Sequence, residues 1–355
     1  MGAEDKVTVS IVVACRNEAK AIRPFIDSVL SQEMQDLCWE VLVADGLSDD
    51  GTRDILEQYA RNNPGFHVIT NPGRIVSTGL NAAIRAARGQ IIIRMDAHTV
   101  YASDYCHRCV EELERTKADN VGGPARTQAK GIRAQAVAAA YHSPFSTGGG
   151  RFHNVSYEGW VDTVPYGCWR KETLERLGLF DEGLVRNQDD ELNLRIVRAG
   201  GKVWQSPLIK SWYSPRSSLS ALFRQYFQYG FWKVAVIRKH SIPASWRHLV
   251  PIAFVLANLF CLLAVSVAKL AGMEGGFIFT AELWLSMLSI YVVALFGASV
   301  MTARRSGWKT LPYLPATFAT FHSSYGLGFL LGLRWYFVKP SSACNLSGAF
   351  TQISR

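Results

Sequence analysis

Two side chains that can bind a metal ion, Asp96 and His98, follow a run of β-branched residues, Ile91–Ile93. The run predicts a buried strand over 91–95. Alternate strand positions face the same side of a sheet, so the carboxylate and the imidazole would point together. In open α/β sheets, ligands bind beyond the carboxyl ends of the strands. Taken alone, the pair is equally compatible with a metal site and with an ordinary strand end at the surface.

A second group of charges, Asp189, Asp190 and Glu191, stands at the start of a helix predicted over 192–199. Carboxylates at this end of a helix are favoured by the helix dipole. Consecutive helical positions point in different directions, and most such runs form a solvated first turn. By itself, this cluster therefore favours a structural role over a chemical one.

Polar residues also follow two earlier apolar runs. Arg16 and Glu18 come after a strand predicted over 7–14, and Asp45 comes after a strand predicted over 39–44. The segment after Asp45 is rich in turn residues and in Ser, Asp and Thr, which can cap a following helix. Three predicted strands thus end in side chains that are capable of chemistry.

The elements that would position these residues are short strands alternating with amphipathic helices. This alternation predicts an α/β fold with a doubly wound, mostly parallel sheet. Later the pattern loosens, and a mobile loop is expected over 146–154. The strands are predicted over 7–14, 39–44, 66–70, 91–95 and 202–205, with β character also over 161–169. One predicted helix ends near residue 30, and others cover 53–61, 77–88, 105–117 and 172–177.

The last third of the chain has a different composition. Three runs without charged residues each approach the roughly 20 residues that cross a bilayer. Before them lies an aromatic and basic helix that we expect in the membrane interface. The sequence therefore predicts a globular domain over 1–218, an interfacial helix region over 219–247 and a membrane domain over 248–355, with spans at about 249–271, 279–303 and 312–334.

Charges around these runs indicate an orientation. Three cations precede the first run, three follow the second, and Glu274 lies between the two runs. By the positive-inside rule, the globular domain would face the cytosol of a multi-pass protein of the cell membrane. No signal peptide is predicted at the polar N-terminus. The six cations are Arg238, Lys239, Arg247, Arg304, Arg305 and Lys309.

The third apolar run allows two topologies. It contains Pro312 and Pro315 and several glycines, and Arg334 and Lys339 follow it. A third span would place these cations outside the cell, whereas a re-entrant hairpin would keep them inside. The length of the run favours a span.

Cysteine and charge content argue against two other classes of protein. Seven cysteines, an odd number in a chain expected in a reducing compartment, argue against a disulfide framework. Cys106 and Cys109 form a C-x-x-C without a second pair, so ordinary helix-face cysteines are favoured over a zinc site. The formal charge of +9 indicates an anionic membrane surface as partner, because no nucleic-acid-binding motif accompanies it.

Four of these segments together resemble a known family. They are 9–18, with S-I-V-V-A-C-R-N-E; 43–52, with V-A-D-G-L-S-D-D-G-T; 94–98, with R-M-D-A-H; and 188–195, with Q-D-D-E-L-N-L-R. Their order and spacing resemble those of the family 2 inverting glycosyltransferases with the GT-A fold. The chain is most similar to the membrane-anchored members of bacterial exopolysaccharide assembly, such as the succinoglycan glucosyltransferases.

This resemblance implies a nucleotide-sugar donor, expected to be a UDP-sugar, and a divalent cation. Arg16, Glu18 and Asp45 match positions that hold the base and ribose, and Arg74 lies where a cation could reach the ribose or diphosphate. Asp96 and His98 match the D-x-D positions that hold Mg²⁺ or Mn²⁺ on the diphosphate, so Asp96 also belongs to the nucleotide site. A histidine in the second position shifts the preference towards Mn²⁺.

The resemblance also implies a general base, Asp189, with Asp190 and Glu191 as alternatives. Gln188 replaces the usual glutamate before it. Further positions match places that shape the donor-sugar pocket and the acceptor entrance, namely Gly123, Trp169 and Arg170, with Asp190 beside the base. Gln225 and Trp232 only loosely resemble the Gln-x-x-Arg-Trp element of processive relatives, and an aromatic interfacial helix is the favoured interpretation.

The implied activity is inverting transfer of one sugar to a membrane-embedded acceptor. A polyprenyl-diphosphate-linked saccharide, in exopolysaccharide or cell-surface glycan assembly, is the favoured acceptor. Transfer to polyprenyl phosphate itself is the alternative enzyme activity. A catalytically silent membrane scaffold is a third hypothesis, against which the carboxylates at 45, 96 and 189 argue.

Overall fold

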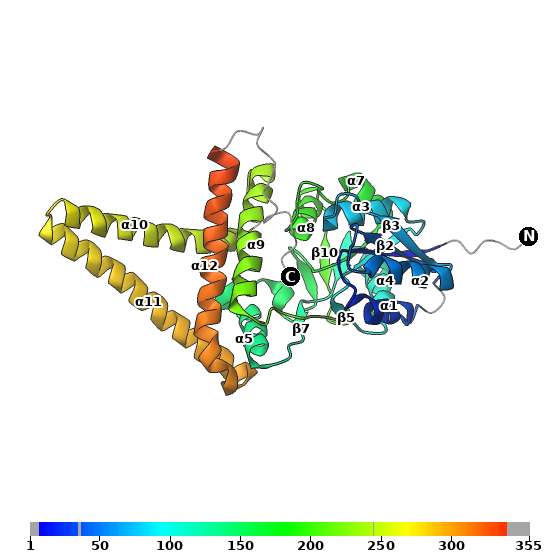
Figure 1. The fold of residues 1–355 in the computed structure, drawn as a ribbon, viewed down its shortest axis with the longest axis horizontal. Helices are drawn as coiled ribbons and strands as arrows, with labels where there is room; N and C mark the ends of the chain where they lie inside the picture. Colours follow the sequence, from blue (N-terminus) through cyan, green and yellow to red (C-terminus); the bar gives the residue numbers. More distant parts are fainter. Residues whose placement is uncertain (1–6, 35–36, 244, 339–355) are drawn as a thin grey trace, which may run out of the picture. The chain divides into compact units, whose positions relative to one another are not determined.

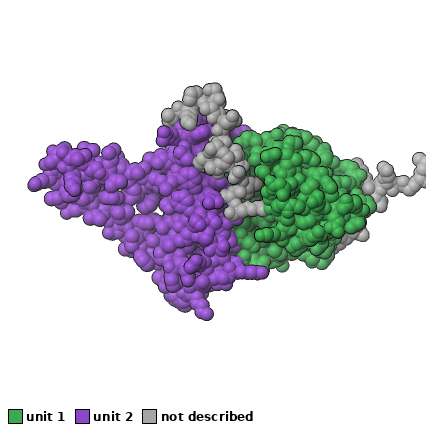
Figure 2. Space-filling view, viewed as in Figure 1, with its two compact units in different colours: residues 1–128, 150–214 green, residues 129–149, 215–355 purple. Residues whose placement is uncertain are grey.

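The computed structural model describes residues 7–34, 37–243 and 245–338, and the chain divides into two compact units. Figure 1 shows the helices and strands of the chain in sequence order of colour. The sheet unit comprises residues 1–128 and 150–214, and the helical unit comprises residues 129–149 and 215–355 (Figure 2). Lys339, one of the two cations that follow the third apolar run, lies outside the described residues.

The sheet unit is built on an eight-stranded sheet with the order β3-β2-β1-β4-β9-β6-β10-β8. Its first half is parallel and consists of β1 (Val9–Cys15), β2 (Trp39–Asp45), β3 (Phe66–Thr70) and β4 (Ile91–Met95). The register pairs Cys15 with Asp45 and Val13 with Met95, so the carboxyl ends of these strands share one edge. The mostly parallel sheet predicted from the sequence is confirmed.

The second half of the sheet is mixed. It consists of β6 (Asn120–Gly122), β8 (Gly159–Val161), β9 (Cys168–Arg170) and β10 (Val203–Gln205), with β9 antiparallel to β4 and β8 antiparallel to β10. The β character predicted over 161–169 is divided between the end of β8 and the start of β9. Pro165 has no N–H to donate, and Tyr166 (φ 61°) and Gly167 (φ 119°) have left-handed backbone, so the chain turns between β8 and β9.

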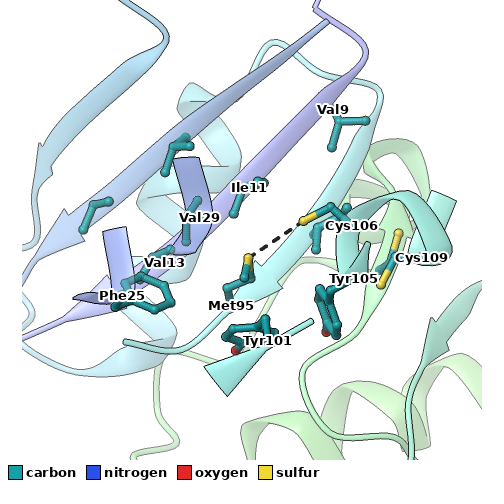
Figure 3. Close-up of a cluster of buried hydrophobic side chains, with 14 of the residues drawn as sticks. Val9, Ile11, Val13, Phe25, Val29, Met95, Tyr101, Tyr105, Cys106 and Cys109 are labelled. Carbon is teal, nitrogen blue, oxygen red and sulfur yellow. Dashed lines mark hydrogen bonds between the residues drawn. The ribbon is translucent and has the colours of Figure 1, made fainter. Parts of the chain in front are cut away.

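Helices cover both faces of the sheet because side chains alternate along each strand. On one face, Val9, Ile11 and Val13 share an apolar cluster with helices α1, α2 and α4. Figure 3 shows part of this cluster, with Phe25 and Val29 of α1 and Tyr105 of α4. On the other face, Val12 and Ile92 share a cluster with α3, α7 and α8. The helices are α1 (Ile22–Leu30), α2 (Thr52–Asn62), α3 (Val76–Ala86), α4 (Tyr105–Thr116), α7 (Lys171–Leu177) and α8 (Gln188–Arg198).

The two cysteines of the C-x-x-C lie in this core. Cys106 and Cys109 of α4 are fully buried, and the Cys106 sulfur lies 3.9 Å from the Met95 sulfur (Figure 3). Across the described ranges, no three His, Cys, Asp or Glu side chains are grouped so as to hold a metal ion by themselves. These cysteines therefore act as small apolar side chains of the core.

A smaller sheet, with the order β5-β11-β7, completes the sheet unit. It consists of β5 (Thr99–Tyr101), β7 (Arg126–Thr127) and β11 (Ser211–Tyr213). The segment 146–154, expected to be a mobile loop, instead contains the end of α6 (Pro144–Thr147) and the 3₁₀ turn Arg151–His153. Its glycines Gly148 and Gly149 have φ of +70°, which terminates α6.

The helical unit begins with an excursion of the chain, residues 129–149, which carries α5 (Ile132–Tyr141) and α6. Ala136, Val137 and Ala140 of α5 share an apolar cluster with Phe318 and other residues of the later helices. His322 adds polar contacts, since its ring nitrogens lie 2.7 Å from the Phe145 carbonyl oxygen and 3.0 Å from the Tyr291 hydroxyl. The domain boundary predicted at residue 218 differs from this division, because it assigns residues 129–149 to the globular domain.

The predicted interfacial helix, α9 (Leu219–His240), packs along α12 (Leu314–Leu333) and is not a solitary surface helix. A Cβ at Gly328 would lie 2.0 Å from the Phe227 carbonyl oxygen, and one at Gly230 would lie 2.1 Å from that of Tyr325. Small residues permit this close approach of two helix backbones, as in membrane helix pairs. Several α9 side chains are consequently buried, including Lys233 at 3 % exposure.

Two helices in the described residues are long and apolar enough to cross a bilayer. They are Trp246–Leu270, which includes α10 (Val250–Leu270), and α11 (Glu274–Ser306), and they correspond to the first two predicted spans. Apolar side chains such as Phe260, Ile290 and Val293 are about 70 % exposed on them (71 %, 71 % and 72 %). The third predicted span forms α12 and is not one of these two helices.

Candidate active site

Strand β4 carries Arg94 and Asp96 to the carboxyl edge of the sheet. The two side chains occupy alternate positions and interact directly. The Arg94 Nε donates to Asp96 Oδ1 at 3.1 Å, and Nη2 donates to Asp96 Oδ2 at 3.2 Å. Arg94 is almost fully buried, at 3 % side-chain exposure, whereas Asp96 keeps 22 %. The result is a two-point contact between a buried cation and a partly exposed carboxylate.

Helix α8 brings Asp189 to the same guanidinium. Asn187 precedes the helix in a left-handed conformation (φ 61°), which turns the chain so that Asp189 falls in the first helical turn. Arg94 Nη1 donates to Asp189 Oδ1. The Asp189 side chain keeps 30 % of its surface exposed. Residues 96 and 189, which the sequence treats as parts of separate motifs, are thus joined through one arginine.

The electrostatics of this trio leave Asp189 easy to protonate. Burial, together with the nearby carboxylates of Asp96 and Asp190, raises the pKa of Asp189 to about 6, against the opposing effect of the Arg94 cation. For Arg94, burial by itself would lower the pKa, but the two carboxylates outweigh it and raise the pKa above its ordinary value. A carboxylate with a pKa near 6 is suited to accept a proton at neutral pH.

The candidate metal ligands, Asp96 and His98, are both accessible, since their side chains are 22 % and 54 % exposed. Glu18 from the loop after β1 faces them, with its Oε1 3.8 Å from His98 Nδ1. A carboxylate and an imidazole suit Mn²⁺ better than Mg²⁺. Each Asp96 oxygen has two lone-pair positions, so the bonds from Arg94 leave acceptor capacity for an ion. The donor set fits a divalent cation that phosphate oxygens also ligate.

The loops after β1 and β2 are tied together around Asp45. Its carboxylate, buried at 2 % exposure, accepts from the Ser48 hydroxyl at 2.5 Å. The same hydroxyl oxygen accepts from the Asn17 N–H at 2.9 Å, and the Glu18 N–H donates to Thr52 Oγ1 at 2.7 Å. Asp45 therefore fixes the loop that carries Arg16 and Glu18.

Arg16 and Arg74 lie on neighbouring loops of the same sheet edge. Arg16 packs against Gly46, where an added Cβ would lie 3.1 Å from the Arg16 Cβ. Arg74, exposed and with a φ of 59°, belongs to a loop anchored by Asn71. The Asn71 N–H donates to the Asp45 carbonyl at 2.8 Å, and its side-chain amide donates to the Ile75 carbonyl at 2.9 Å. The predicted nucleotide-binding residues therefore share one edge.

Three residues predicted to shape the donor or acceptor pocket have other environments. Trp169 is 1 % exposed and packs edge-on against Phe180 in the core. Arg170 pairs with Ile91 in the sheet register, at the opposite end of β4 from Asp96, and its side chain bonds Glu114 at 2.9 Å. Gly123 permits close backbone contact, since a Cβ there would lie 2.0 Å from the Ile209 carbonyl oxygen.

The alternatives to Asp189 differ in accessibility. Glu191 has no exposed surface, and Arg195 donates to its carboxylate at 2.9 Å and 3.0 Å. Glu191 is therefore held in a buried ion pair within α8 and is not accessible from outside. Asp190 accepts from the Thr163 hydroxyl at 3.3 Å and lies beside the site.

Gln225 and Trp232 belong to α9 in the helical unit. The Gln225 amide donates to the Tyr229 hydroxyl at 3.3 Å, one helical turn away. Trp232 is 1 % exposed and contacts Phe231 edge-on. Both side chains are therefore buried within the helical unit.

Sequence reasoning did not single out Arg94, although its place two residues before Asp96 put it on the same strand face. It also missed a set of non-glycine residues with left-handed backbone. Five of them lie in or beside the loops of the site, at Asn17, Leu47, Arg74, Tyr166 and Asn187. Such conformations are strained for residues with a Cβ and cluster at functional sites.

The fold and this site together define a class of protein. Residues 10–170 match the family model described as glycosyl transferase family 2. The chain belongs to this family, since a curated relative supports the same assignment over most of its length.

That relative is the succinoglycan biosynthesis protein ExoA of Rhizobium meliloti, 34 % identical over 257 residues, which cover 72 % of this chain and 78 % of the relative. A second is the dolichyl N-acetyl-alpha-D-glucosaminyl phosphate 3-beta-D-2,3-diacetamido-2,3-dideoxy-beta-D-glucuronosyltransferase of Methanococcus voltae. It is 26 % identical over 333 residues, which cover 92 % of this chain and 97 % of the relative.

Among solved structures, the chain is similar to the mannosyltransferase PcManGT from Pyrobaculum calidifontis in complex with GDP-Man and Mn²⁺. The TM-score is 0.57 at 20 % identity, and the match covers 88 % of this chain and 86 % of that one. This likeness supports the GT-A fold assignment.

Proposed function

We propose that this glycosyltransferase moves one sugar, with inversion at the anomeric carbon, from a UDP-sugar to a saccharide carried on polyprenyl diphosphate. The observation that carries the proposal is the joining of Asp96 and Asp189 through Arg94 at the carboxyl edge of the sheet. It brings a candidate ligand of the donor diphosphate and a candidate proton acceptor to one cation. Such a pair is what a one-step displacement requires.

Asp189 is the proposed general base. It takes the proton of the acceptor hydroxyl as that oxygen forms a bond to the anomeric carbon. The bond from that carbon to the diphosphate oxygen breaks, and its electron pair leaves with the nucleoside diphosphate. The raised pKa of about 6 supports this role, because the carboxylate is ionised at neutral pH yet basic enough to bind a proton.

Asp96 and His98 are the proposed ligands of Mn²⁺ or Mg²⁺, with Glu18 3.8 Å from His98. When bound, the cation would offset negative charge on the departing diphosphate. Arg16, Glu18, Asp45 and Arg74 are proposed to hold the base, ribose and diphosphate. Their common place on the loops of one sheet edge supports this assignment.

Two observations support an acceptor that resides in a membrane. The exposed apolar side chains of α10 and α11 favour insertion into a bilayer. The Methanococcus voltae relative is named for transfer to a sugar on dolichyl phosphate, an acceptor that already carries a saccharide. The same comparison favours a lipid-linked saccharide over polyprenyl phosphate itself. We further propose that the sheet unit faces the cytosol from the cell membrane, as the flanking cations indicate.

The test is an acceptor comparison with the full chain in lipid nanodiscs. UDP-glucose and GDP-mannose are supplied with Mn²⁺, and either polyprenyl phosphate or a polyprenyl-diphosphate-linked monosaccharide is the acceptor. Extension of the monosaccharide by wild-type protein, but not by Asp189→Asn, is the expected result. Product on polyprenyl phosphate alone would identify the alternative synthase. Folded protein that releases no nucleotide from either donor would favour the scaffold hypothesis.

A further inference from the structure

Inside the site, a single buried cation contacts two carboxylates that both reach the surface. Arg94 is 3 % exposed, whereas Asp96 keeps 22 % and Asp189 keeps 30 % of its side-chain surface. The cation therefore lies beneath the two anions. In that position it can orient them without competing for the space that a substrate needs.

The guanidinium uses three of its donors for this purpose. Nε and Nη2 bind the two oxygens of Asp96, and Nη1 binds Oδ1 of Asp189. Arginine presents its donors in one rigid plane, so these three contacts fix the separation and relative orientation of the two carboxylates. A lysine ammonium is a point charge on a flexible stem and cannot reproduce that geometry.

Arg94 is itself held rigidly. Its backbone N–H donates to the Gly167 carbonyl at 3.1 Å, and its guanidinium carbon lies 5.9 Å from the centre of the Phe180 ring. Phe180 belongs to the apolar cluster on one face of the sheet. The cation is thus anchored to the core on one side and to both carboxylates on the other.

A second arginine of the sheet unit gives a useful contrast. Arg195 also binds a carboxylate at two points, but its partner Glu191 has no exposed surface, and further donors go to the Leu177 and Leu179 carbonyls. In that arrangement, the donors of Arg195 are used within the protein and connect α8 to the chain around residues 177–179. Around Arg94 the buried partner is the cation and the accessible partners are the anions.

We propose that Arg94 is a positioning residue for the transfer reaction. It holds Oδ1 of Asp189 and so leaves Oδ2 as the oxygen that takes the acceptor proton, at a fixed place relative to the diphosphate ligand Asp96. This inference rests on the proposed function. It goes beyond that function in assigning the alignment of base and donor site to a residue that contacts neither substrate.

The test compares Arg94→Lys with Asp189→Asn and with the double variant, all as full chains in nanodiscs. Hydrolysis of UDP-glucose or GDP-mannose with Mn²⁺ is measured, because water as acceptor makes the assay independent of the lipid substrate. Arg85→Lys is the matched control, since Arg85 is 62 % exposed and pairs with Glu182 at the surface. Rates are compared at a temperature at which melting curves show every variant folded.

Arg94→Lys is expected to lower kcat about 100-fold, because the general base is displaced. The KM for the donor is expected to stay within about threefold of the wild-type value. Binding of UDP with Mn²⁺, measured by calorimetry, is expected to stay within about threefold, which a general structural defect would not allow. The double variant is expected to be no slower than Asp189→Asn, because the alignment of base and donor site that Arg94 provides is already lost with the base. Arg85→Lys is expected to match the wild type.

Two results would overturn the inference and leave the proposed function in place. One is a wild-type kcat in Arg94→Lys, and the other is a double variant more than about tenfold slower than Asp189→Asn. Full turnover by Asp189→Asn would instead refute the base assignment, and with it both proposals. If Arg94→Lys does not fold, Arg94→Gln, which keeps an amide donor without the charge, is measured in its place with the same expectations.

Discussion

The two units of this chain differ most in their charge. The sheet unit has 27 acidic and 23 basic residues, a formal charge of −4, whereas the helical unit has two acidic and 15 basic residues, a charge of +13. The excess of positive charge in the whole chain, +9, therefore comes from the helical unit. Carboxylates are concentrated where metal and proton chemistry is proposed, and cations where an anionic membrane surface would be the partner. The positive charge of the chain therefore points to a partner of the helical unit and not of the sheet unit.

The units also differ in how they pack. The sheet unit follows the alternation of β-branched residues along its strands, with Ile11 and Val12 on opposite faces. The helical unit depends on glycines, such as Gly230 and Gly328, at which helix backbones approach closely. Variants at the site of the sheet unit should therefore affect the chemistry. Variants at the close helix contacts of the helical unit should affect the folding of that unit.

The largest effect is expected from Asp189→Asn in the sheet unit. Losing the base should lower kcat by about 10³-fold, with UDP affinity unchanged, because the amide keeps the shape of the side chain but cannot accept the proton. Single-turnover kinetics and calorimetry measure the two quantities. Asp190→Asn is the neighbouring control, expected to be far milder, and an equal loss there would move the base to Asp190.

Changes at the proposed metal ligands should come next. Asp96→Ala should remove metal-dependent turnover, and His98→Ala should weaken Mn²⁺ affinity about 10- to 100-fold, because each takes away one protein ligand. Manganese titration followed by electron paramagnetic resonance, with UDP present, measures the affinity directly. An unaltered titration in His98→Ala would reduce the site to Asp96.

The pH dependence should follow the Asp189 carboxylate. Its pKa is raised to about 6, so the base is ionised above that pH and protonated below it. We expect kcat/KM to be level near neutral pH and to fall about tenfold for each pH unit below about 6. A profile without this limb, in wild-type protein that stays folded, would contradict the assignment.

In the helical unit, Gly328→Val should destabilise the fold without touching the chemistry. Its side chain would meet the Phe227 carbonyl, where even a Cβ would lie at 2.0 Å, and separating the helices should cost about 1–3 kcal/mol. Thermal unfolding measures the loss. Gly297→Val on α11, where nothing lies within 4 Å of an added Cβ, is the control. UDP binding should be the same in both variants.

The smallest effect is expected from neutralising the exposed pair Arg304 and Arg305. Each cation near an anionic membrane surface contributes about 1 kcal/mol at low salt. The double change to Gln should therefore weaken association with phosphatidylserine vesicles, but not with phosphatidylcholine vesicles, in flotation assays. The same loss with both lipids would point to a folding defect.

Much of the fold was predictable because its signals are local. The β-branched run that ends at Asp96 and the turn-rich segment after Asp45 each report a strand end by themselves. The pairing of Arg94 with Asp189 joins positions 95 residues apart, and its burial follows from packing that no short pattern encodes. The surroundings of Arg170 are equally non-local, since the reversed direction of β9 places it opposite Ile91.

The excursion over residues 129–149 has a practical consequence for protein production. A chain cut after Ser214 would keep α5 but lose the helices that cover Ala136, Val137 and Ala140, and the uncovered apolar face would favour aggregation. The flanks of the excursion are close, since the Ala125 N–H donates to the Phe152 carbonyl at 2.8 Å. A soluble fragment should therefore be obtained by two edits, removing everything after residue 214 and bridging Gln128 to Gly150 with a short glycine-rich linker.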